Sequence, residues 1–520
     1  MLKGVHKTLY ILLTLFIGLL LISSFFIRAE YNYVAYGDVP ILQAQRLIPF
    51  LFLVIVLAIL GVLLYKLFLK LNTYSAKIII PVVLSLSFIL QLSIVLLFPR
   101  MPTDDSQMVI ELALWIQTHN DYSSFQDTGY LHMYPFNFST VMYLKTLLEL
   151  FPNLNYVLVF KIFNILFTLV TTLMTYLIYK QLNNKQHNNE YGILIFAATF
   201  IPALFTNNLI YNDIISTAFL TSSLYFSIRF IKDKEIKHII FAAVLLAIGN
   251  YFRSIGVIFL IAIIICILLS IQKIGFKKLL LSLFILGILF NSPNWIQALA
   301  LKSTGQVTES VNKNSAPVYM WLNMGINLES FGFYDNGESF NIYQNQANRN
   351  KAESTKIYKE SIEKKLHDYK FTDLAKMYYK KVLWTWTEGT YQLERYGISN
   401  SGTSDTGQSI IGGYSYKTFA TDLFDGQSNF RSKTLWIVYV MNFIMYIFIL
   451  IKLIGSIKNK QFNEVSLVLI ILGFVGFYIL WEIKSRYIYP IYPILIILSY
   501  TGCGSFNKWL KSRSFHRSNL

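Results

Sequence analysis

The stretch 100–135 holds the residues whose types and spacing could do chemistry. Two adjacent carboxylates, Asp104 and Asp105, stand just after a hydrophobic run, residues 78–98. That run is long enough to span a bilayer, so we expect the acidic pair at a membrane surface. A carboxylate in this place could take a proton from an attacking hydroxyl group. The alternative is structural, because Asp104 with Gln107 fits a capping box ahead of a helix.

Further polar residues stand near the ends of other hydrophobic runs or in the loop after the acidic pair. A polar group in or beside a membrane segment is costly, so its position is informative. On the predicted topology these residues all face one compartment, where they could line one cavity with carboxylates for acid–base chemistry and cations for an anionic group. The candidates are His132 and Tyr134 in GYLHMYP, Tyr211 and Asp213 in NNLIYNDIIS, Arg253 in GNYFRSIG, and Glu482, Lys484, Arg486 and Tyr487 in LWEIKSRYIYPIYP.

Several of these candidates also have a structural interpretation. Asp213 could cap the helix that follows it. Arg253 and Arg486 could anchor their segments to lipid headgroups. His132 could be a hydrogen-bonded surface histidine. Glu482 could hold the Arg486 guanidinium in place, or it could be the wet end of its span.

Composition places the chain among membrane proteins. Of 520 residues, 54% are hydrophobic and 14% are charged, whereas a soluble domain carries about 25% charged residues. The net charge of +17 comes largely from Lys in short loops, and no basic stretch is interleaved with the aromatics that nucleic-acid binding needs, so we expect no nucleic-acid partner. Cys266 and Cys503 lie in apolar segments, which predicts neither a disulfide nor a thiolate metal site.

Hydrophobic runs of about 17–25 residues predict spanning helices. The first run has a basic flank like a signal peptide, but it lacks a small-residue cleavage site and more runs follow, so we interpret it as an uncleaved anchor. We predict twelve spans, at about 8–27, 47–67, 77–98, 155–179, 191–208, 212–231, 237–252, 254–272, 278–296, 434–454, 464–482 and 487–503.

The distribution of Lys and Arg predicts the orientation of these spans. With the N-terminus in the cytoplasm, every short inside loop is basic, both termini are cytoplasmic, and the acidic pair faces outward from a bacterial plasma membrane. The residues concerned are Lys66, Lys70, Lys77, Lys180, Lys185, Lys232, Lys234, Lys237, Lys273, Lys277, Lys278, Lys452, Lys458, Lys460, Lys508, Lys511, Arg513 and Arg517.

Two outer segments are long. The first, residues 99–154, has two amphipathic stretches that predict helices lying on the membrane surface or packed on other spans. One has Met108, Leu112 and Trp115 at helical spacing, and the other has Val141, Leu144 and Leu148.

The second outer segment, residues 297–433, is large enough for a soluble domain. Helices are predicted at 353–369 and 372–386, the latter with Leu374, Tyr378 and Val382 on one face, and a mobile Gly- and Ser-rich loop at 398–415. Trp384 and Trp386 are expected to be core or interfacial aromatics rather than sugar platforms.

The predicted fold class is an all-α polytopic membrane protein with about twelve transmembrane helices, amphipathic surface helices in the first outer loop and a mixed outer domain. We divide the chain into four parts. They are two N-terminal spans at 1–76, a transmembrane core at 77–296 with the outer loop 99–154, the outer domain 297–433, and C-terminal spans with a basic tail at 434–520.

With these residues laid out, the chain resembles a bacterial membrane glycosyltransferase of the GT-C superfamily. It is similar to the branch of dolichyl-phosphate-mannose protein mannosyltransferases, or glycosyltransferase family 39. The two N-terminal spans lie outside the resemblance, which runs from about residue 77 to 503. Five ordered stretches carry it: TDDSQMVIELA, HMYPFNFS, IYNDIIS, PVYMWLNMGINLESFGFYD and WEIKSRYIYPIYP.

This resemblance implies transfer of a sugar from a polyprenyl phosphate to an acceptor hydroxyl outside the membrane, usually with inversion. It implies that Asp105, with Asp104 second, is the base or orients the acceptor, and that Arg486 and Arg253 bind the lipid phosphate. No cofactor is implied, although a divalent ion on Asp104 and Asp105 stays an alternative. The second acidic position is Asp rather than Glu and the outer loop has no separate sugar-binding domain, so a wall polymer, a lipid or a protein are all possible acceptors.

Other classes of protein make different demands on the same residues. A transporter or flippase of lipid-linked sugars also needs many spans and cations, but it predicts polar groups near the midplane and on both faces. A non-catalytic scaffold does not need the acidic pair. Polymerases and ligases that use lipid-linked glycans are the enzymes hardest to distinguish from a glycosyltransferase of this type.

Overall fold

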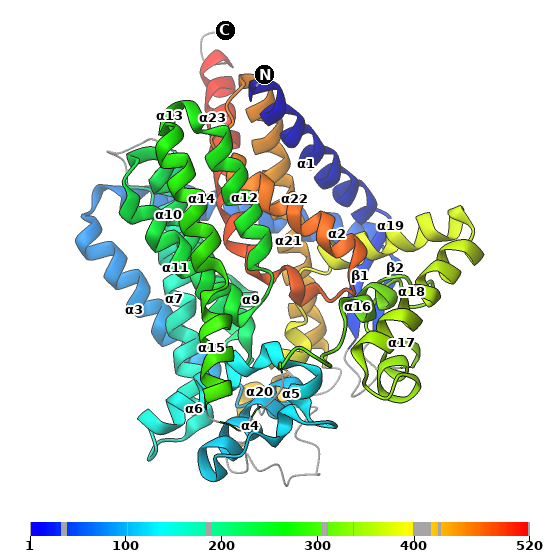
Figure 1. Cartoon of the computed structure of the whole chain (residues 1–520). Helices are drawn as coiled ribbons and strands as arrows, with labels where there is room; N and C mark the ends of the chain where they lie inside the picture. Colours follow the sequence, from blue (N-terminus) through cyan, green and yellow to red (C-terminus); the bar gives the residue numbers. More distant parts are fainter. Residues whose placement is uncertain are drawn as a thin grey trace.

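Long apolar helices run side by side in the computed structural model of the chain (Figure 1). The structure describes residues 2–517 except 33–38, 101, 184–188, 304, 306, 308–309, 336, 399–415, 417 and 425–427. The predicted Gly- and Ser-rich loop therefore lies outside the described residues, apart from its first residue.

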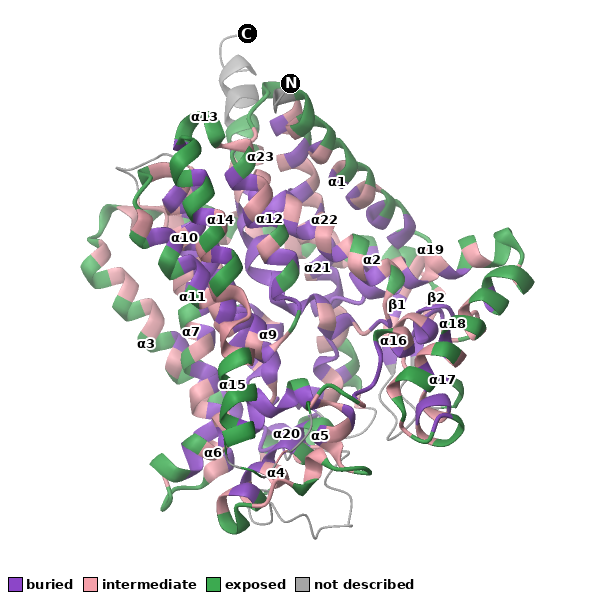
Figure 2. Cartoon of the chain, viewed as in Figure 1, coloured by how far each residue is buried: buried purple, intermediate pink, exposed green. Residues whose placement is uncertain are grey.

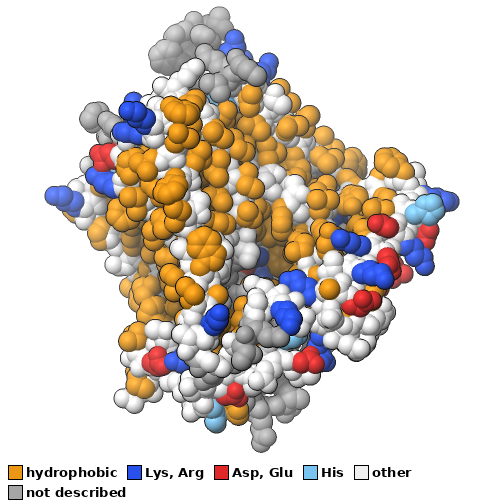
Figure 3. All heavy atoms as spheres, in the orientation of Figure 1, with side chains coloured by type: hydrophobic (Ala, Val, Ile, Leu, Met, Phe, Trp, Pro, Cys, Tyr) orange, Lys and Arg blue, Asp and Glu red, His pale blue; other side chains and the backbone are white. Residues whose placement is uncertain are grey.

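Among the described residues, eight helical segments are long and apolar enough to cross a membrane. Apolar side chains cover the bundle on the face seen in Figure 3, and charged side chains gather at its ends and over the lateral outer domain. The chain is an all-α polytopic membrane protein. The eight segments are α1 (Leu2–Ser24), α2 (Leu47–Leu69), α3 (Ala76–Leu97), α7 (Tyr156–Leu182), α10 (Asn212–Asp233), α14 (Phe276–Phe290) with α15 (Ser292–Ser303), α21 (Asn429–Asn459), and α23 (Tyr492–Arg517) with the short 3₁₀ helix η6 (Ser485–Ile491) before it.

Three further apolar helices are shorter, and one predicted span is broken. The shorter helices are α11 (Ile236–Phe252), α12 (Gly256–Leu269) and α22 (Val465–Leu480). The prediction of one continuous helix at 191–208 is wrong, because α8 (Gly192–Ala198) and α9 (Ile201–Thr206) are separated at Thr199 and Phe200. Pro202 lies in the first turn of α9, where its missing N–H does no harm, whereas a continuous helix would lose a hydrogen bond there.

Both termini lie at one end of the bundle, together with α13 (Ile271–Ile274) (Figure 1). At the opposite end lie α4 (Asp105–His119), α5 (Tyr130–Met133), α6 (Phe138–Leu150) and α20 (Phe419–Leu423). Figure 2 shows the buried residues concentrated along the middle of the bundle. The first outer segment is thus a helical layer over one end of the spans.

The helices of this layer pack on each other and on the spans. The predicted apolar face of α6 is confirmed, because Val141, Leu144 and Leu148 are buried. On the predicted apolar face of α4, Leu112 packs partly on the same cluster as these residues, whereas packing on other helices is wrong for Met108 and Trp115, and a membrane-surface position of this face stays a prediction. Met108 and Trp115 are exposed, and Val109, Ile110, Ala113 and Ile116 are the buried residues that meet α6. Two overlapping sets of apolar residues share helical spacing on α4, and packing against α6 selects between them.

The second outer segment is largely helical in its described part. It contains α16 (Val318–Gly325), α17 (Glu338–Asn341), α18 (Lys351–Asp368) and α19 (Phe371–Thr387), followed by the short π-helix η5 (Glu394–Ile398). The two predicted helices are confirmed as α18 and α19. Trp384 and Trp386 are buried, which confirms them as core aromatics.

A β-hairpin joins the two N-terminal spans to this outer domain. Strand β1 (Ile27–Asn32) pairs antiparallel with β2 (Val39–Ala44). The Trp384 indole N–H donates to the Glu30 carbonyl at 2.8 Å, and Ala29 and Tyr31 pack in the same apolar cluster as Trp384. The hairpin was not predicted from the sequence.

Candidate active site

The two adjacent aspartates of the first outer segment have different surroundings. The Asp104 carboxylate lies 2.5 Å from the Arg395 guanidinium of η5 and makes no capping bond to α4. Gln107 donates to Glu111 instead, so the capping-box hypothesis is wrong. Burial raises the pKa of Asp104, but the charge and hydrogen bond of Arg395 outweigh it and lower the pKa overall.

Asp105 begins α4 and receives a hydrogen bond from a tyrosine. The Tyr130 hydroxyl donates to Asp105 Oδ1 at 3.1 Å, Asn137 Nδ2 donates to the Tyr130 oxygen at 2.6 Å, and the Tyr211 hydroxyl donates to Asn137 Oδ1 at 3.0 Å. Burial raises the pKa of Tyr130 well above 10, so its hydroxyl stays a donor. The chain of bonds leads from an exposed carboxylate to the spans.

The start of α4 is fixed against the turn before α10. The Ser106 hydroxyl, next to Asp105, donates to the Ile210 carbonyl at 2.6 Å. Both Ser106 and Ile210 are buried. A buried hydrogen bond next to the carboxylate limits its movement relative to Tyr211.

Asp213 is the buried anion of this region, and two arginines approach it. Arg253 makes an ion pair with Asp213 Oδ1, and Arg486 Nε lies 3.8 Å from Asp213 Oδ2. Helix α10 begins at Asn212 without a side-chain cap, so the cap hypothesis for Asp213 is wrong. The headgroup-anchor hypothesis is wrong for both arginines, because each guanidinium is directed to a buried carboxylate.

Close packing of α10 on α11 sets the distance between Asp213 and Arg253. Gly249 allows it, because a Cβ there would lie 2.8 Å from Leu220 Cδ2. The Ser216 hydroxyl donates to the Gly249 carbonyl at 2.8 Å. Arg253 follows the end of α11, so this packing brings its side chain to the start of α10.

Arg486 lies between two tyrosine rings. Its guanidinium carbon is 4.4 Å from the Tyr396 ring centroid and 5.5 Å from that of Tyr211. Among the described residues this guanidinium donates no hydrogen bond, and its Nε is buried without an acceptor. Planar cation–π contacts hold the group in place, and its fork of donors stays available for an oxyanion.

Glu482 pairs with residues other than the predicted Arg486. It is buried, it accepts a hydrogen bond from the Tyr487 hydroxyl at 2.7 Å, and its Oε1 lies 3.9 Å from Lys484 Nζ. It is therefore neither the wet end of a span nor the observed partner of Arg486. Burial is the main cause that raises the pKa of Glu482. Lys484 Nζ also lies 4.8 Å above the Tyr334 ring.

The second outer segment holds residues 482–484, which lie between α22 and η6, by their backbone. Glu482 N–H donates to the Trp321 carbonyl at 3.1 Å, and Ile483 N–H donates to the Gly332 carbonyl at 2.8 Å. In the same region, Lys381 Nζ donates to the Gly325 carbonyl at 2.8 Å. The backbone hydrogen bonds of Glu482 and Ile483 therefore place Lys484 beside residues that are far from it in the sequence.

The two remaining predicted residues differ in their contacts. Tyr134 lies beside the Asp105 network, with its ring centroid 5.3 Å from that of Tyr130. His132 Nδ1 lies 3.3 Å from the Phe125 carbonyl within its own loop. Among the described residues, His132 forms no hydrogen bond or ion pair with the acidic or cationic groups above, which favours its structural interpretation.

Sequence reasoning missed several residues of this region. Tyr130 lies in GYLHMYP and Asn137 lies in HMYPFNFS, and both could have been found as polar residues in an otherwise apolar stretch. Arg395 and Tyr396 stand in LERYG, just before the Gly- and Ser-rich loop, and no spacing relates them to Asp104 or Arg486. Only the fold brings them together.

The divalent ion considered for Asp104 and Asp105 would need further oxygen ligands besides these two carboxylates. No group of three or more His, Cys, Asp or Glu side chains gathers among the described residues. Asp104 is engaged by Arg395 and Asp105 by Tyr130, so the two carboxylates do not share a cage of oxygen ligands.

Comparison with known proteins supports the class that this site suggests. Residues 140–297 match the family model of dolichyl-phosphate-mannose-protein mannosyltransferase. This segment runs from α6 into α15 and contains Tyr211, Asp213 and Arg253. No curated protein matches the chain. The match confirms the resemblance to this family over residues 140–297, which include IYNDIIS of the five stretches, and supports a mannosyltransferase-like membrane glycosyltransferase.

We expect Asp104 and Arg395 to act as one unit. Asp104→Asn and Arg395→Gln should each lower transfer activity moderately, and the double variant should be little worse than either, because both changes remove the same contact. The measurement is transfer activity in reconstituted membranes. Lys145→Gln, which breaks the surface pair with Glu149 on α6, is the control and should have little effect. Independent, multiplying losses would show that the two residues act separately.

Proposed function

We propose that this protein transfers a sugar from a polyprenyl phosphate to an acceptor hydroxyl at the outer face of the bacterial plasma membrane. The acceptor is a cell-surface glycan, a wall polymer, a lipid or a protein. The observation that carries the proposal is the placement of the Asp105 hydrogen-bond network beside Asp213, Arg253 and Arg486 at one end of the spans. A base and cations for a phosphate then face one reaction centre.

In this proposal Asp105 is the base and Asp104 is not. Asp104 is paired with Arg395, which lowers its pKa and makes it a poor proton acceptor. Asp105 is exposed and has a hydroxyl donor that orients it. It takes the proton as the acceptor oxygen bonds to the anomeric carbon. Attack from the side opposite the phosphate inverts that carbon.

The leaving group takes the electron pair of the broken carbon–oxygen bond and becomes a phosphate with added charge. Arg486 is the residue best placed to stabilise it, because its guanidinium is held by two aromatic rings and donates no hydrogen bond within the described part of the chain. Lys484 and Arg253 add positive charge nearby, and Tyr487 contacts both Glu482 and Arg253. Such preorganised charge favours the transition state over the donor.

The outer-face location rests on the basic loops. Lys273 lies in α13, at the same end of the bundle as both termini, whereas α4–α6 lie at the other end (Figure 1). Basic loops remain in the cytoplasm, so the end with Asp105 faces outward.

Loss of the Asp105 carboxylate should abolish transfer. Asp105→Asn keeps the size and a hydrogen-bonding group but removes the base, which contributes on the order of 10²–10⁴ in rate. The measurement is mass spectrometry of surface glycans from cells that lack the protein and carry the variant, with membrane expression as the folding control. Asp335→Asn, at a carboxylate that accepts from the Gly337 N–H of its own turn in the outer domain, is the matched variant. Wild-type glycans in Asp105→Asn cells would reject the assignment.

The variant Arg486→Lys tests whether Arg486 binds the donor phosphate through its planar guanidinium or only supplies a positive charge. We expect the apparent donor affinity or turnover to fall on the order of tenfold or more, because Lys cannot offer the planar fork and a hydrogen bond to a charged group contributes about 1.5–3 kcal/mol. Donor titration in reconstituted membranes measures it. Arg229→Lys, in an exposed pair with Asp233 at 3.0 Å, is the control. Unchanged donor kinetics in Arg486→Lys would exclude this role.

The orientation can be tested with single cysteines, because Cys266 and Cys503 are buried. Exposed Glu360 lies on α18 and exposed Lys458 lies near the end of α21. In intact cells an impermeant maleimide should label Glu360→Cys, and it should label Lys458→Cys only after permeabilisation. The reverse pattern would place the acidic pair in the cytoplasm.

A further inference from the structure

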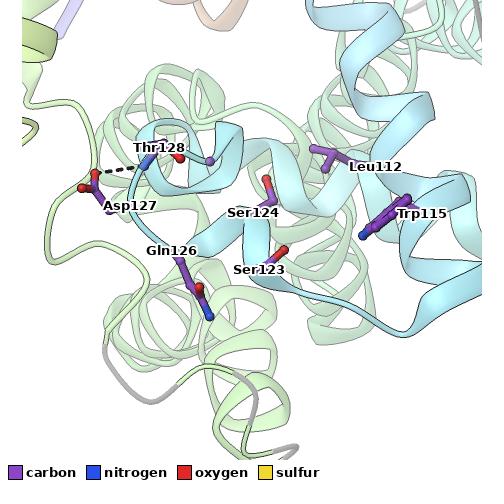
Figure 4. A pocket seen from close by; sticks show the side chains of 8 residues that line it. Leu112, Trp115, Ser123, Ser124, Gln126, Asp127 and Thr128 are labelled. Atoms are coloured by element: carbon purple, nitrogen blue, oxygen red, sulfur yellow. Dashed lines mark hydrogen bonds between the residues drawn. The ribbon is translucent and has the colours of Figure 1, made fainter.

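A polar pocket beside α4 is not used by the chemistry proposed above. It has a volume of about 440 Å³ and lies between Leu112 and Trp115 of α4 and the loop 123–129. Figure 4 shows the two α4 side chains on one side and the side chains of the loop on the other. The pocket belongs to the layer of helices at the end of the bundle that carries Asp105 (Figure 1).

Trp115 offers this pocket an apolar aromatic surface. Its side chain is 48% exposed, although His119 stacks on one face with ring centroids 3.9 Å apart. The exposed area therefore belongs to its other face and its edges. Trp384 is buried in the core, whereas Trp115 presents an exposed aromatic surface beside a polar loop.

The tryptophan and the loop are held in place before any ligand arrives. Asp121 Oδ2 accepts both the Trp115 indole N–H and the Ser123 hydroxyl, each at 2.9 Å. The Ser124 hydroxyl accepts from Leu131 N–H at 3.1 Å. Gly129 is packed against Ser124, because a Cβ there would lie 2.1 Å from the Ser124 carbonyl oxygen.

The loop also leaves hydrogen-bonding groups for a ligand. The side chains of Gln126 and Thr128 are exposed and make no hydrogen bond with the described residues. The lining contains no Lys or Arg among the described residues, and its one charged side chain, Asp127, is paired with Arg349 at 3.2 Å. The pocket therefore does not suit a phosphate or an anionic headgroup. It suits a neutral ligand that has both hydroxyl groups and apolar C–H faces, which is the chemistry of a saccharide.

The pocket has a direct geometric relation to Asp105. Trp115 follows Asp105 by ten residues on the same helix, which corresponds to about 15 Å along the axis. A ligand on Trp115 could thus reach Asp105 only if it were longer than a single sugar. We propose that this pocket binds the distal part of an acceptor glycan, so that the acceptor is an oligosaccharide or polysaccharide chain. This inference rests on the proposed function and specifies its acceptor.

The test measures binding without turnover. The protein in lipid nanodiscs is titrated with oligosaccharides released from the surface glycans of cells that lack it, separated into single sugars and longer chains, and binding is followed by saturation-transfer NMR. We expect longer chains to bind more tightly than single sugars. Trp115→Ala should weaken the longer chains on the order of tenfold, and Trp115→Phe should weaken them less because it keeps a ring.

Two further variants supply a second test of the pocket and a control. Gln126→Ala changes an exposed side chain without hydrogen bonds and should fold normally while also weakening binding. Trp295→Ala removes another exposed tryptophan, 52% exposed on α15, and should leave binding unchanged. Equal binding of long chains by the wild type, Trp115→Ala and Gln126→Ala would overturn the proposal.

The experiment also separates this proposal from its alternatives. Binding of long chains that depends on Trp115, in a wild-type protein that transfers no sugar, would reject the proposed function and keep the pocket. Transfer to long acceptors that Trp115→Ala does not change would reject the pocket and keep the proposed function. Trp115→Cys labelled with a polarity-sensitive dye should report water in nanodiscs, and an apolar signal would make this face a membrane contact and overturn the proposal.

Discussion

A buried carboxylate needs a cation beside it, and Asp213 imposes this requirement at the end of the bundle opposite the termini. Removing one partner of a buried ion pair costs several kcal/mol, and at the start of α10 Arg253 pairs with Asp213 while Arg486 lies close to it. Three segments that are distant in sequence are thereby joined. The same constraint holds positive charge where the proposed donor phosphate would bind, so the stability of this region and its proposed chemistry depend on one group.

The second outer segment completes the site from the side. Backbone bonds from Glu482 and Ile483 to the α16 region hold the loop that carries Lys484 and Arg486, and Arg395 of η5 holds Asp104. The site is therefore built from both outer segments and the ends of several spans. A site assembled in this way has groups in place before the substrates arrive, which is what electrostatic stabilisation requires.

Predictions from hydrophobic pattern failed where local geometry or packing intervened. The run 191–208 has the composition of a span, but a proline in it permits two short helices instead. The face by which α4 packs on α6 was not predicted, because composition cannot say which neighbour a helix meets. The β-hairpin at 27–44 was missed because its short strands follow a long helix and include a segment of mixed polarity.

The sequence by itself determined the membrane class, most of the spans, the acidic pair and the polar residues at the ends of the spans, because hydrophobic length and the cost of polar groups in a bilayer are local properties. Only the tertiary structure decided which residues meet. In the fold, Asp104 pairs with Arg395, Asp105 accepts a hydrogen bond from Tyr130, and the Tyr396 ring lies beside Arg486. These contacts join residues separated by up to several hundred positions, and no spacing along the chain encodes them, since they depend on how the helices pack.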